Sequence, residues 1–158
     1  MKMNIGISED NLQNVVLELS KILADQYVLH TKTKQAHWNI EGNDFYDKHK
    51  LFDEQANQIA ETIDSVAERI RTLGHLVPTT LKAFLELSHL TENVPTENNS
   101  QSFIKELLSA HETIINHLRE NINLFANDYE DLGTSDFITG LMQEHEKTAW
   151  FLRAHLKK

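Results

Sequence analysis

Residues 43–73 read NDFYDKHKLFDEQANQIAETIDSVAERIRTL, and this stretch carries the clearest helical pattern in the chain. Its apolar side chains recur at the three- and four-residue spacing of a single helix face. They are Phe45, Phe52, Ala56, Ile59, Ile63, Val66 and Ile70. Gly74 follows directly and favours a helix end there. The stretch therefore predicts one long amphipathic helix from about Asn43 to Leu73.

An earlier segment has the same periodicity. It begins near Ser8, a predicted N-cap, and ends before Gly42, so that His37 and Trp38 fall in or just past the last turn. Its apolar stripe consists of Leu12, Val15, Val16, Leu19, Ile22, Leu23 and Tyr27. The sequence therefore predicts a first long helix that leads through a short connection into the second.

Two more long helices are expected in the second half of the chain. The third follows the cap signal at residues 98–100, and the fourth starts at Thr134 or Ser135, after Gly133. Their stripes are Ile104, Leu107, Leu108, Ile114, Ile115, Leu118, Ile122 and Phe125, and then Ile138, Leu141, Met142, Ala149, Leu152 and Leu156. Gly140 lies inside the fourth helix, where close helix packing would explain it.

The segment between the second and third long helices, residues 75–99, contains both prolines and is too long for a tight turn. Within it, TLKAFLELSHL (residues 80–90) predicts a short helix. A long crossover at this place favours an all-α, ferritin-like four-helix bundle over an up-down-up-down bundle. We expect a single domain over residues 1–158, with short tails at 1–8 and 157–158.

The composition restricts the classes of function. There are no cysteines, which excludes disulfides, thiolate metal sites and cysteine nucleophiles. The formal net charge of −9 argues against general affinity for a phosphate backbone and is compatible with binding cations. The sequence shows no secretory signal and no apolar run near the ~18 residues that span a bilayer. We therefore expect a cytoplasmic protein with no membrane partner.

Residues of metal-binding type cluster between positions 37 and 68. His49 and Asp53 are four residues apart, as are Asp64 and Glu68, so each pair lies on one helix face. Together with His37 they supply two imidazoles and three carboxylates, a set that suits iron, zinc or manganese.

These residues cannot all bind one ion within one chain. Asp53 and Asp64 are eleven residues apart, which places them only ~20° apart around the helix axis but ~16 Å apart along it. Metal–ligand bonds are ~2 Å long. If two copies of the helix pack antiparallel about a two-fold axis near Gln58 and Ile59, each pair of one chain faces the other pair of its neighbour. Two equal sites between subunits would result.

Simpler explanations remain open on spacing alone. A polar helix face is usually just solvated, and Asp64 and Glu68 could pair with Arg69 or Arg71 at the surface. His49 occupies a core-type position, where a histidine is more often structural than a ligand.

Several other residues are weaker candidates. Glu86 and His89 match the E-x-x-H pattern of intrabundle di-iron proteins, but the motif occurs only once, so coincidence is the better interpretation. His111 and His145 fall on apolar stripes and are interpreted as buried structural histidines. Trp150 is interpreted, with its neighbour Phe151, as a core or interface residue.

The motifs together resemble those of the Dps family, or mini-ferritins. The residues that carry the resemblance are TKQAHWN (33–39), Gly42, the pair His49 and Asp53, DSVAER (64–69) and the C-terminal HEK (145–147) and WFLR (150–153). The resemblance covers nearly the whole chain, with its elements in the expected order.

The resemblance implies a homododecameric shell with ferroxidase centres at its two-fold interfaces. By position, His37, His49 and Asp53 would come from one subunit and Asp64 and Glu68 from its neighbour. It further implies that Trp38 lies close to the centre and quenches radicals. The implied activity is oxidation of Fe(II), preferentially by hydrogen peroxide, with storage of the Fe(III) mineral and protection against oxidative stress. Zinc is expected to compete with iron.

The same resemblance points to Asp131 and Asp136 as residues of an iron-uptake pore, although a loop and a helix cap explain them equally well. Many family members bind DNA through a lysine-rich N-terminal tail. Here Lys2 is the only basic residue before the first helix, so DNA binding at neutral pH is not expected. The alternative function is a nucleoid-associated, DNA-compacting protein whose iron chemistry is secondary.

Overall fold

The computed structural model describes residues 4–156. The helices in this range are α1 (Glu9–Asn39), α2 (Phe45–Thr72), α3 (Leu81–Leu87), α4 (Ser100–Asn123) and α5 (Leu132–Ala154), with a π-helical turn η1 (Leu124–Asp128) between α4 and α5. The expected four long helices and the short helix in the crossover are therefore confirmed. None of these helices combines the length and apolar character that a bilayer crossing needs.

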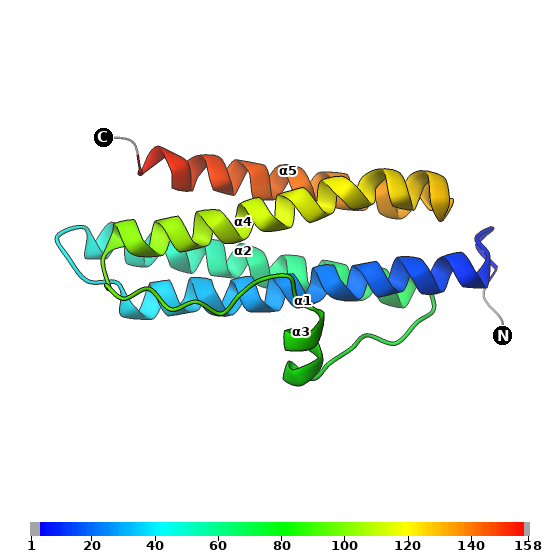
Figure 1. Ribbon diagram of the computed structural model, residues 1–158, viewed down its shortest axis with the longest axis horizontal. Coiled ribbons are helices and arrows are strands. Elements are labelled where there is room, and N and C mark those ends of the chain that lie inside the picture. The colour runs from blue at the N-terminus through cyan, green and yellow to red at the C-terminus, as the bar shows by residue number, and fades with distance from the viewer. Residues whose placement is uncertain (1–3, 157–158) are drawn as a thin grey trace.

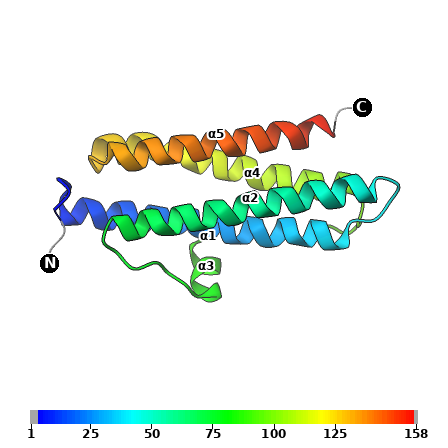
Figure 2. The same ribbon diagram turned by 180° about the vertical axis from the view of Figure 1, so that it is seen from behind.

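The bundle consists of two helix pairs. α1 packs along α2, and α4 packs along α5, whereas α2 and α5 barely touch each other. Figure 1 and Figure 2 show that α2 and α4 run in the same direction, because the crossover returns the chain to the end of the molecule where α2 began. The long 75–99 segment predicted this order of helices. In the resulting bundle, α2 and α5 face each other with little direct contact.

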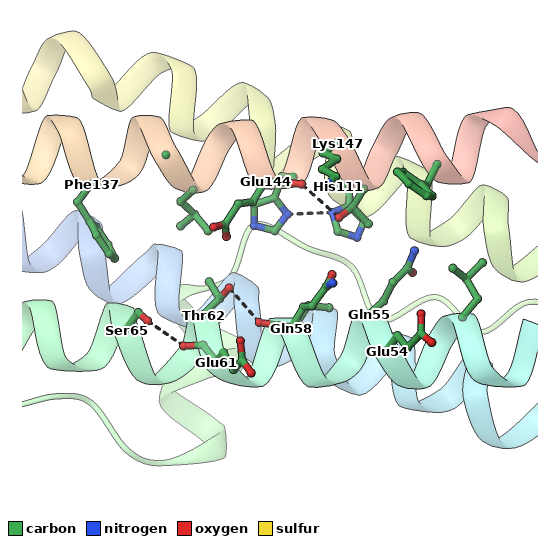
Figure 3. A pocket seen from close by; sticks show the side chains of 17 residues that line it. Glu54, Gln55, Gln58, Glu61, Thr62, Ser65, His111, Phe137, Glu144 and Lys147 are labelled. Carbon is green, nitrogen blue, oxygen red and sulfur yellow. Dashed lines mark hydrogen bonds between the residues drawn. The ribbon is translucent and has the colours of Figure 1, made fainter.

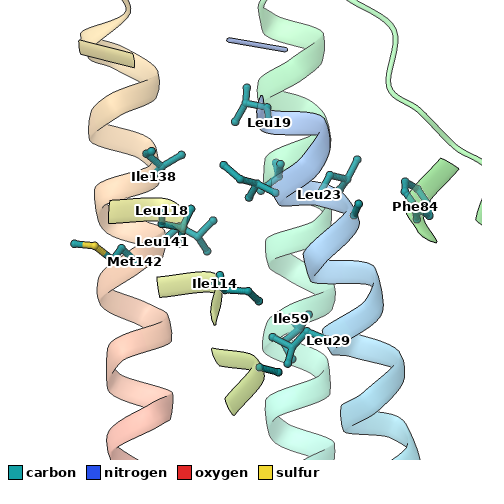
Figure 4. Packing of buried hydrophobic residues seen from close by; sticks show 14 of the residues in the cluster. Leu19, Leu23, Leu29, Ile59, Phe84, Ile114, Leu118, Ile138, Leu141 and Met142 are labelled. Carbon is teal, nitrogen blue, oxygen red and sulfur yellow. The ribbon is translucent and has the colours of Figure 1, made fainter. Parts of the chain in front are cut away.

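The core lies between the two pairs, and its residues come from all the long helices (Figure 4). Leu19 and Leu29 of α1 are fully buried, as are Leu118 of α4 and Ile138 of α5. Each fully buried aliphatic side chain contributes roughly 1.5–3 kcal/mol relative to an exposed one. Packing of the apolar stripes therefore fixes how the polar faces of α2 and α5 are presented.

The starts of the helices show which sequence signals act as caps. Ser8 and Asn99 cap α1 and α4 as predicted, each accepting a hydrogen bond from the backbone N–H three residues on. The prediction that the last helix begins at Thr134 or Ser135 was wrong, because Asp131 caps it. The Asp131 carboxylate accepts from the Thr134 N–H at 2.9 Å, which places Gly133 inside the first turn.

Buried polar residues of α1 hold the crossover in place. The Asp25 carboxylate accepts hydrogen bonds from the Ser88 hydroxyl at 2.7 Å and from the His89 backbone N–H at 2.6 Å. The Lys32 ammonium donates to the Thr91 carbonyl at 2.9 Å. These contacts satisfy groups that would otherwise be costly to bury. They also tie the 75–99 segment to the outer side of α1.

The explanation of Gly140 by close helix packing was wrong for the single subunit. A Cβ atom built at Gly140 would meet no heavy atom within 4 Å. The residue lines the space between α2 and α5 rather than a tight helix crossing.

Candidate metal centre

Two histidines at the α1–α2 connection hold each other in a fixed orientation. His37 lies in the last turn of α1, and its Nδ1 donates to the backbone carbonyl of His49 at 2.7 Å. In return, His49 Nδ1 donates to the carbonyl of His37 at 2.7 Å. A carbonyl can only accept, so both rings carry a proton on Nδ1. The rings stack with centroids 3.9 Å apart, and with Nδ1 protonated it is Nε2 of each ring that is left to bind a metal ion.

The connection between the helices makes this arrangement feasible. α1 closes at Ile40, whose N–H donates to the Ala36 carbonyl at 3.0 Å. Gly42 then adopts φ +125°, a conformation that other residues rarely adopt. The Glu41 N–H donates to the Asn98 carbonyl at 2.7 Å, which anchors the turn to the start of α4. The reversal brings the last turn of α1 beside the first turns of α2.

Asp53 completes the group of potential ligands at this end of α2. Its Oδ1 accepts from the Lys34 ammonium at 3.0 Å and lies 3.6 Å from His37 Nε2. The hydrogen bond from Lys34 is the main cause that lowers the pKa of Asp53, and it outweighs the opposing effect of desolvation. The carboxylate is therefore ionised at neutral pH and available to a cation. Lys34 was not among the site residues predicted from the sequence, although its three-residue spacing from His37 places both on one face of α1.

Asp64 and Glu68 lie further along α2, both exposed to solvent. In the described range, residues 4–156, neither carboxylate forms an ion pair. Arg69 instead donates to the Thr134 hydroxyl, and Arg71 donates to the His75 carbonyl. The alternative interpretation, that Asp64 and Glu68 are partners of these arginines, has no support in the single subunit.

The two groups stay separate within one chain. Across residues 4–156, no three His, Asp or Glu side chains gather closely enough to hold a metal ion. This agrees with the ~16 Å separation expected from helix geometry. Trp38 adjoins the first group: its side chain is 68% exposed, and the Lys34 ammonium lies 5.4 Å from its ring centroid.

Comparisons with known proteins place the chain in a family. Residues 16–158 match the family described as Ferritin-like domain. A low-temperature-induced protein of Nostoc sp. is 37% identical over 156 residues, which covers 99% of this chain and 87% of that protein. DNA protection during starvation protein 2 of Bacillus anthracis is 32% identical over 146 residues, with 92% and 99% covered.

The fold gives the same answer. The crystal structure of a Dps protein from Vibrio cholerae O1 matches with a TM-score of 0.91 and 28% identity, covering 99% of this chain and 98% of that one. That protein is described as a member of a broad superfamily of ferritin-like diiron-carboxylate proteins. The chain belongs to the Dps family of ferritin-like proteins. Membership of the Dps family supports iron storage and protection as its general function.

The two residues that the Dps resemblance assigned to an uptake pore differ in their surroundings. Asp131 is only 3% exposed, caps α5 and lies 3.4 Å from the Arg69 guanidinium. Asp136 lies one turn further along α5 and is exposed. The structural role of Asp131 is therefore visible in one subunit, and a pore role for either residue stays a prediction about the assembled protein.

Three further histidines, His89, His111 and His145, lie outside the His37 and His49 group. His89 Nδ1 donates to the buried Asp25 carboxylate at 2.9 Å, and Glu86 lies near Lys82 instead, which agrees with coincidence as the origin of the E-x-x-H match. His111 and His145 are buried, as predicted. Trp150 is 61% exposed in the single subunit, which excludes the core among the two places expected for it.

Proposed function

We propose that this protein oxidises Fe(II), preferentially with hydrogen peroxide, at ferroxidase centres between subunits and stores the Fe(III) product inside a dodecameric shell. His37, His49 and Asp53 of one subunit would face Asp64 and Glu68 of its two-fold neighbour. Protection against oxidative stress would follow from removing both reactants. Zinc is expected to compete for the same ligands. A cytoplasmic location remains part of this proposal.

The single observation that carries the proposal is the reciprocal hydrogen bonding of His37 and His49. A buried structural histidine would be expected to use both ring nitrogens. Here Nδ1 of each ring donates to a backbone carbonyl, and His37 Nε2 lies near the ionised Asp53. In metal sites the second ring nitrogen of a ligand is held in this way.

The chemistry follows from pairing ferrous ions as substrate. Two Fe(II) ions give one electron each, and hydrogen peroxide with two protons then yields two water molecules and two Fe(III) ions. A lone Fe(II) gives only one electron and releases hydroxyl radical. The carboxylates of Asp53, Asp64 and Glu68 offset the higher charge of the ferric product, while the two imidazoles bind without adding charge. Trp38 adjoins the histidines and is exposed, so it is placed to react with a radical that escapes.

The double substitution Asp64→Ala with Glu68→Ala tests the proposal. Both side chains are exposed, so we expect the variant to fold and to lose peroxide-driven Fe(II) oxidation by at least about tenfold, because half of each centre is missing. The measurement is anaerobic Fe(II) loading followed by addition of peroxide, reading the initial rate and the ratio of Fe(II) oxidised to peroxide consumed. The wild-type ratio should be near two to one.

Asp47→Ala is the matched control. It removes an exposed carboxylate from the same helix but from neither ligand group, so the rate should stay at the wild-type value. Unchanged oxidation in the Asp64→Ala, Glu68→Ala variant would show that the ferroxidase assignment is wrong.

A further inference from the structure

A pocket of about 620 Å³ lies between α2 and α5, the two long helices that barely touch each other. Figure 3 shows Gln55, Gln58 and Thr62 of α2 facing Glu144 of α5 across it. At its base lies His111 of α4, so the pocket reaches from the surface of the bundle into the core. It is separate from the His37 and His49 group, which does not line it.

Two buried polar atoms in this pocket lack partners. His111 is 2% exposed and Gln55 is 6% exposed. Within the described part of the chain, His111 Nε2 and Gln55 Oε1 have no hydrogen-bond partner. An unsatisfied buried polar group costs roughly 1–3 kcal/mol. Two of them lining one pocket indicate a place built for a ligand that binds both.

Hydrogen bonding through His145 to Gln26 orients the His111 ring. Its Nδ1 lies 2.8 Å from His145 Nδ1, and His145 Nε2 lies 3.0 Å from the Gln26 side-chain nitrogen. A half-turn of a side-chain amide exchanges the positions of its oxygen and nitrogen atoms. Gln26 Oε1 has no hydrogen-bond partner among the described residues either, so this half-turn breaks no hydrogen bond of that oxygen. With the Gln26 oxygen toward His145, each ring donates toward Gln26, and His111 Nε2 keeps a free lone pair. A metal ligand at His111 Nε2 requires this placement, because with the nitrogen toward His145 the proton lies on His111 Nε2. This is the supporting shell that an imidazole ligand needs.

The charges around the pocket favour a cation. Burial, with a smaller contribution from His145, lowers the pKa of His111 well below its usual value, so the ring is neutral at pH 7. The walls carry three carboxylates, those of Glu54, Glu61 and Glu144, against one ammonium, that of Lys147. A neutral imidazole, an amide oxygen and nearby carboxylates form a donor set suited to a borderline divalent ion.

We propose that this pocket binds a divalent transition-metal ion through His111 Nε2 and Gln55 Oε1, with wall carboxylates and water completing the coordination. Both buried ligands come from one chain, so the site needs no neighbouring subunit, unlike the ferroxidase centre. Only two protein donors are fixed, and no three His, Asp or Glu side chains gather within residues 4–156, so the ion is held weakly and exchanges. Gln26 acts as a positioning residue through His145.

Titration with Co(II) tests the site in the assembled protein. The background is His49→Ala with Glu68→Ala, which removes one ligand from each half of the ferroxidase centre. Equilibrium dialysis and visible absorbance should then show about one Co(II) per chain with an imidazole-containing ligand field. Gln55→Leu and His111→Leu in this background should each weaken binding at least about tenfold, and Gln26→Leu should weaken it less.

Thr148→Val is the control variant. Thr148 lines the same pocket, but its hydroxyl already donates to the Glu144 carbonyl at 3.2 Å, so Co(II) binding should not change. The proposal is overturned if the background binds no Co(II), which would mean that the pocket holds only water. Equal binding in Gln55→Leu and Thr148→Val would also overturn it. If His111→Leu fails to fold, as judged by circular dichroism, Gln55→Leu decides alone.

Iron oxidation by the background variant is read separately. Persistent peroxide-driven oxidation there would contradict the ferroxidase proposal and leave the pocket result intact, because Gln55 plays no part in that centre.

Discussion

The imidazoles of His37 and His49 take their orientation from backbone carbonyls, each supplied by the other residue. The short turn between the two helices predicted that these histidines lie close together. Their hydrogen bonds to each other's backbone carbonyls were not predicted, because these bonds depend on how the two helix ends align. It also left open a structural role for His49, and the free Nε2 atom favours the ligand role.

At the same scale, His145 makes the stability of the protein depend on pH. Burial lowers its pKa to about 4, whereas the unfolded chain titrates near 6.5. The stabilisation is complete above pH ~6.5 and is lost progressively as the pH falls to about 4, because the unfolded state then binds more protons. The shift corresponds to about 3 kcal/mol per chain. Urea unfolding from pH 7.5 to 4.5, with chelator present, should show this loss.

The variant His145→Gln should show a shallower decline over the same pH range, because it removes one of the two buried histidines whose pKa is lowered; His111 is the other. His155→Gln is the control: His155 lies at the exposed end of α5, and its Nδ1 donates to the Phe151 carbonyl at 2.8 Å. Identical pH profiles for His145→Gln and the wild type would show that His145 does not govern acid sensitivity.

At the scale of elements, helix positions followed from apolar periodicity, and most ends followed from caps. The exception was α5, which begins at Leu132 after the cap residue Asp131 rather than at Thr134 or Ser135. The Asp131 carboxylate accepts from the Thr134 N–H three residues on, and Arg69 of α2 also lies 3.4 Å from it. Asp is itself a common N-cap residue. The prediction treated Gly133 as the residue before the helix, whereas Gly133 lies inside the first turn, so the predicted start was two or three residues too late.

Two glycines should respond to alanine in opposite directions. Gly140→Ala should raise the free energy of unfolding by ~1 kcal/mol, because the residue is helical and its new methyl group meets nothing within 4 Å. Gly74→Ala should lower it by about 1–2 kcal/mol, because φ is +84° at the end of α2. Chemical denaturation of both variants measures this. A destabilised Gly140→Ala variant would indicate that a neighbouring subunit packs there.

At the scale of the whole molecule, catalysis and assembly are linked if the two half-sites meet between subunits. Chains with His49→Ala and Asp53→Ala, and chains with Asp64→Ala and Glu68→Ala, should each be inactive alone. Mixed randomly in equal amounts during refolding, they should recover about a quarter of wild-type Fe(II) oxidation. Half of the two-fold pairs are then mixed, and each mixed pair contains one intact centre. No recovery in mixtures of correct mass would argue against a shared centre.

The surface charge of the whole chain bears on the alternative DNA-binding function. With a net charge of −9 per chain, we expect no retardation of duplex DNA at pH 7.5 and moderate salt. A clear shift at low nanomolar protein would contradict this. At pH 5.5 the repulsion should weaken but persist. Burial lowers the pKa of His111, of His145 and, together with the charge of Lys34, of His30, so these three histidines resist gaining charge on acidification. Lys2, Lys157 and Lys158 lie outside the described residues.

The sequence by itself determined the four long helices, the crossover helix and the separation of the metal-type residues into two groups. Periodicity and helix rise are local properties, so spacing along the chain suffices for them. Only the tertiary structure decided the hydrogen bonds between His37 and His49, the Lys34 contact with Asp53 and the pocket that ends at His111. Each of these joins residues from different helices, and its geometry depends on how the packed faces align.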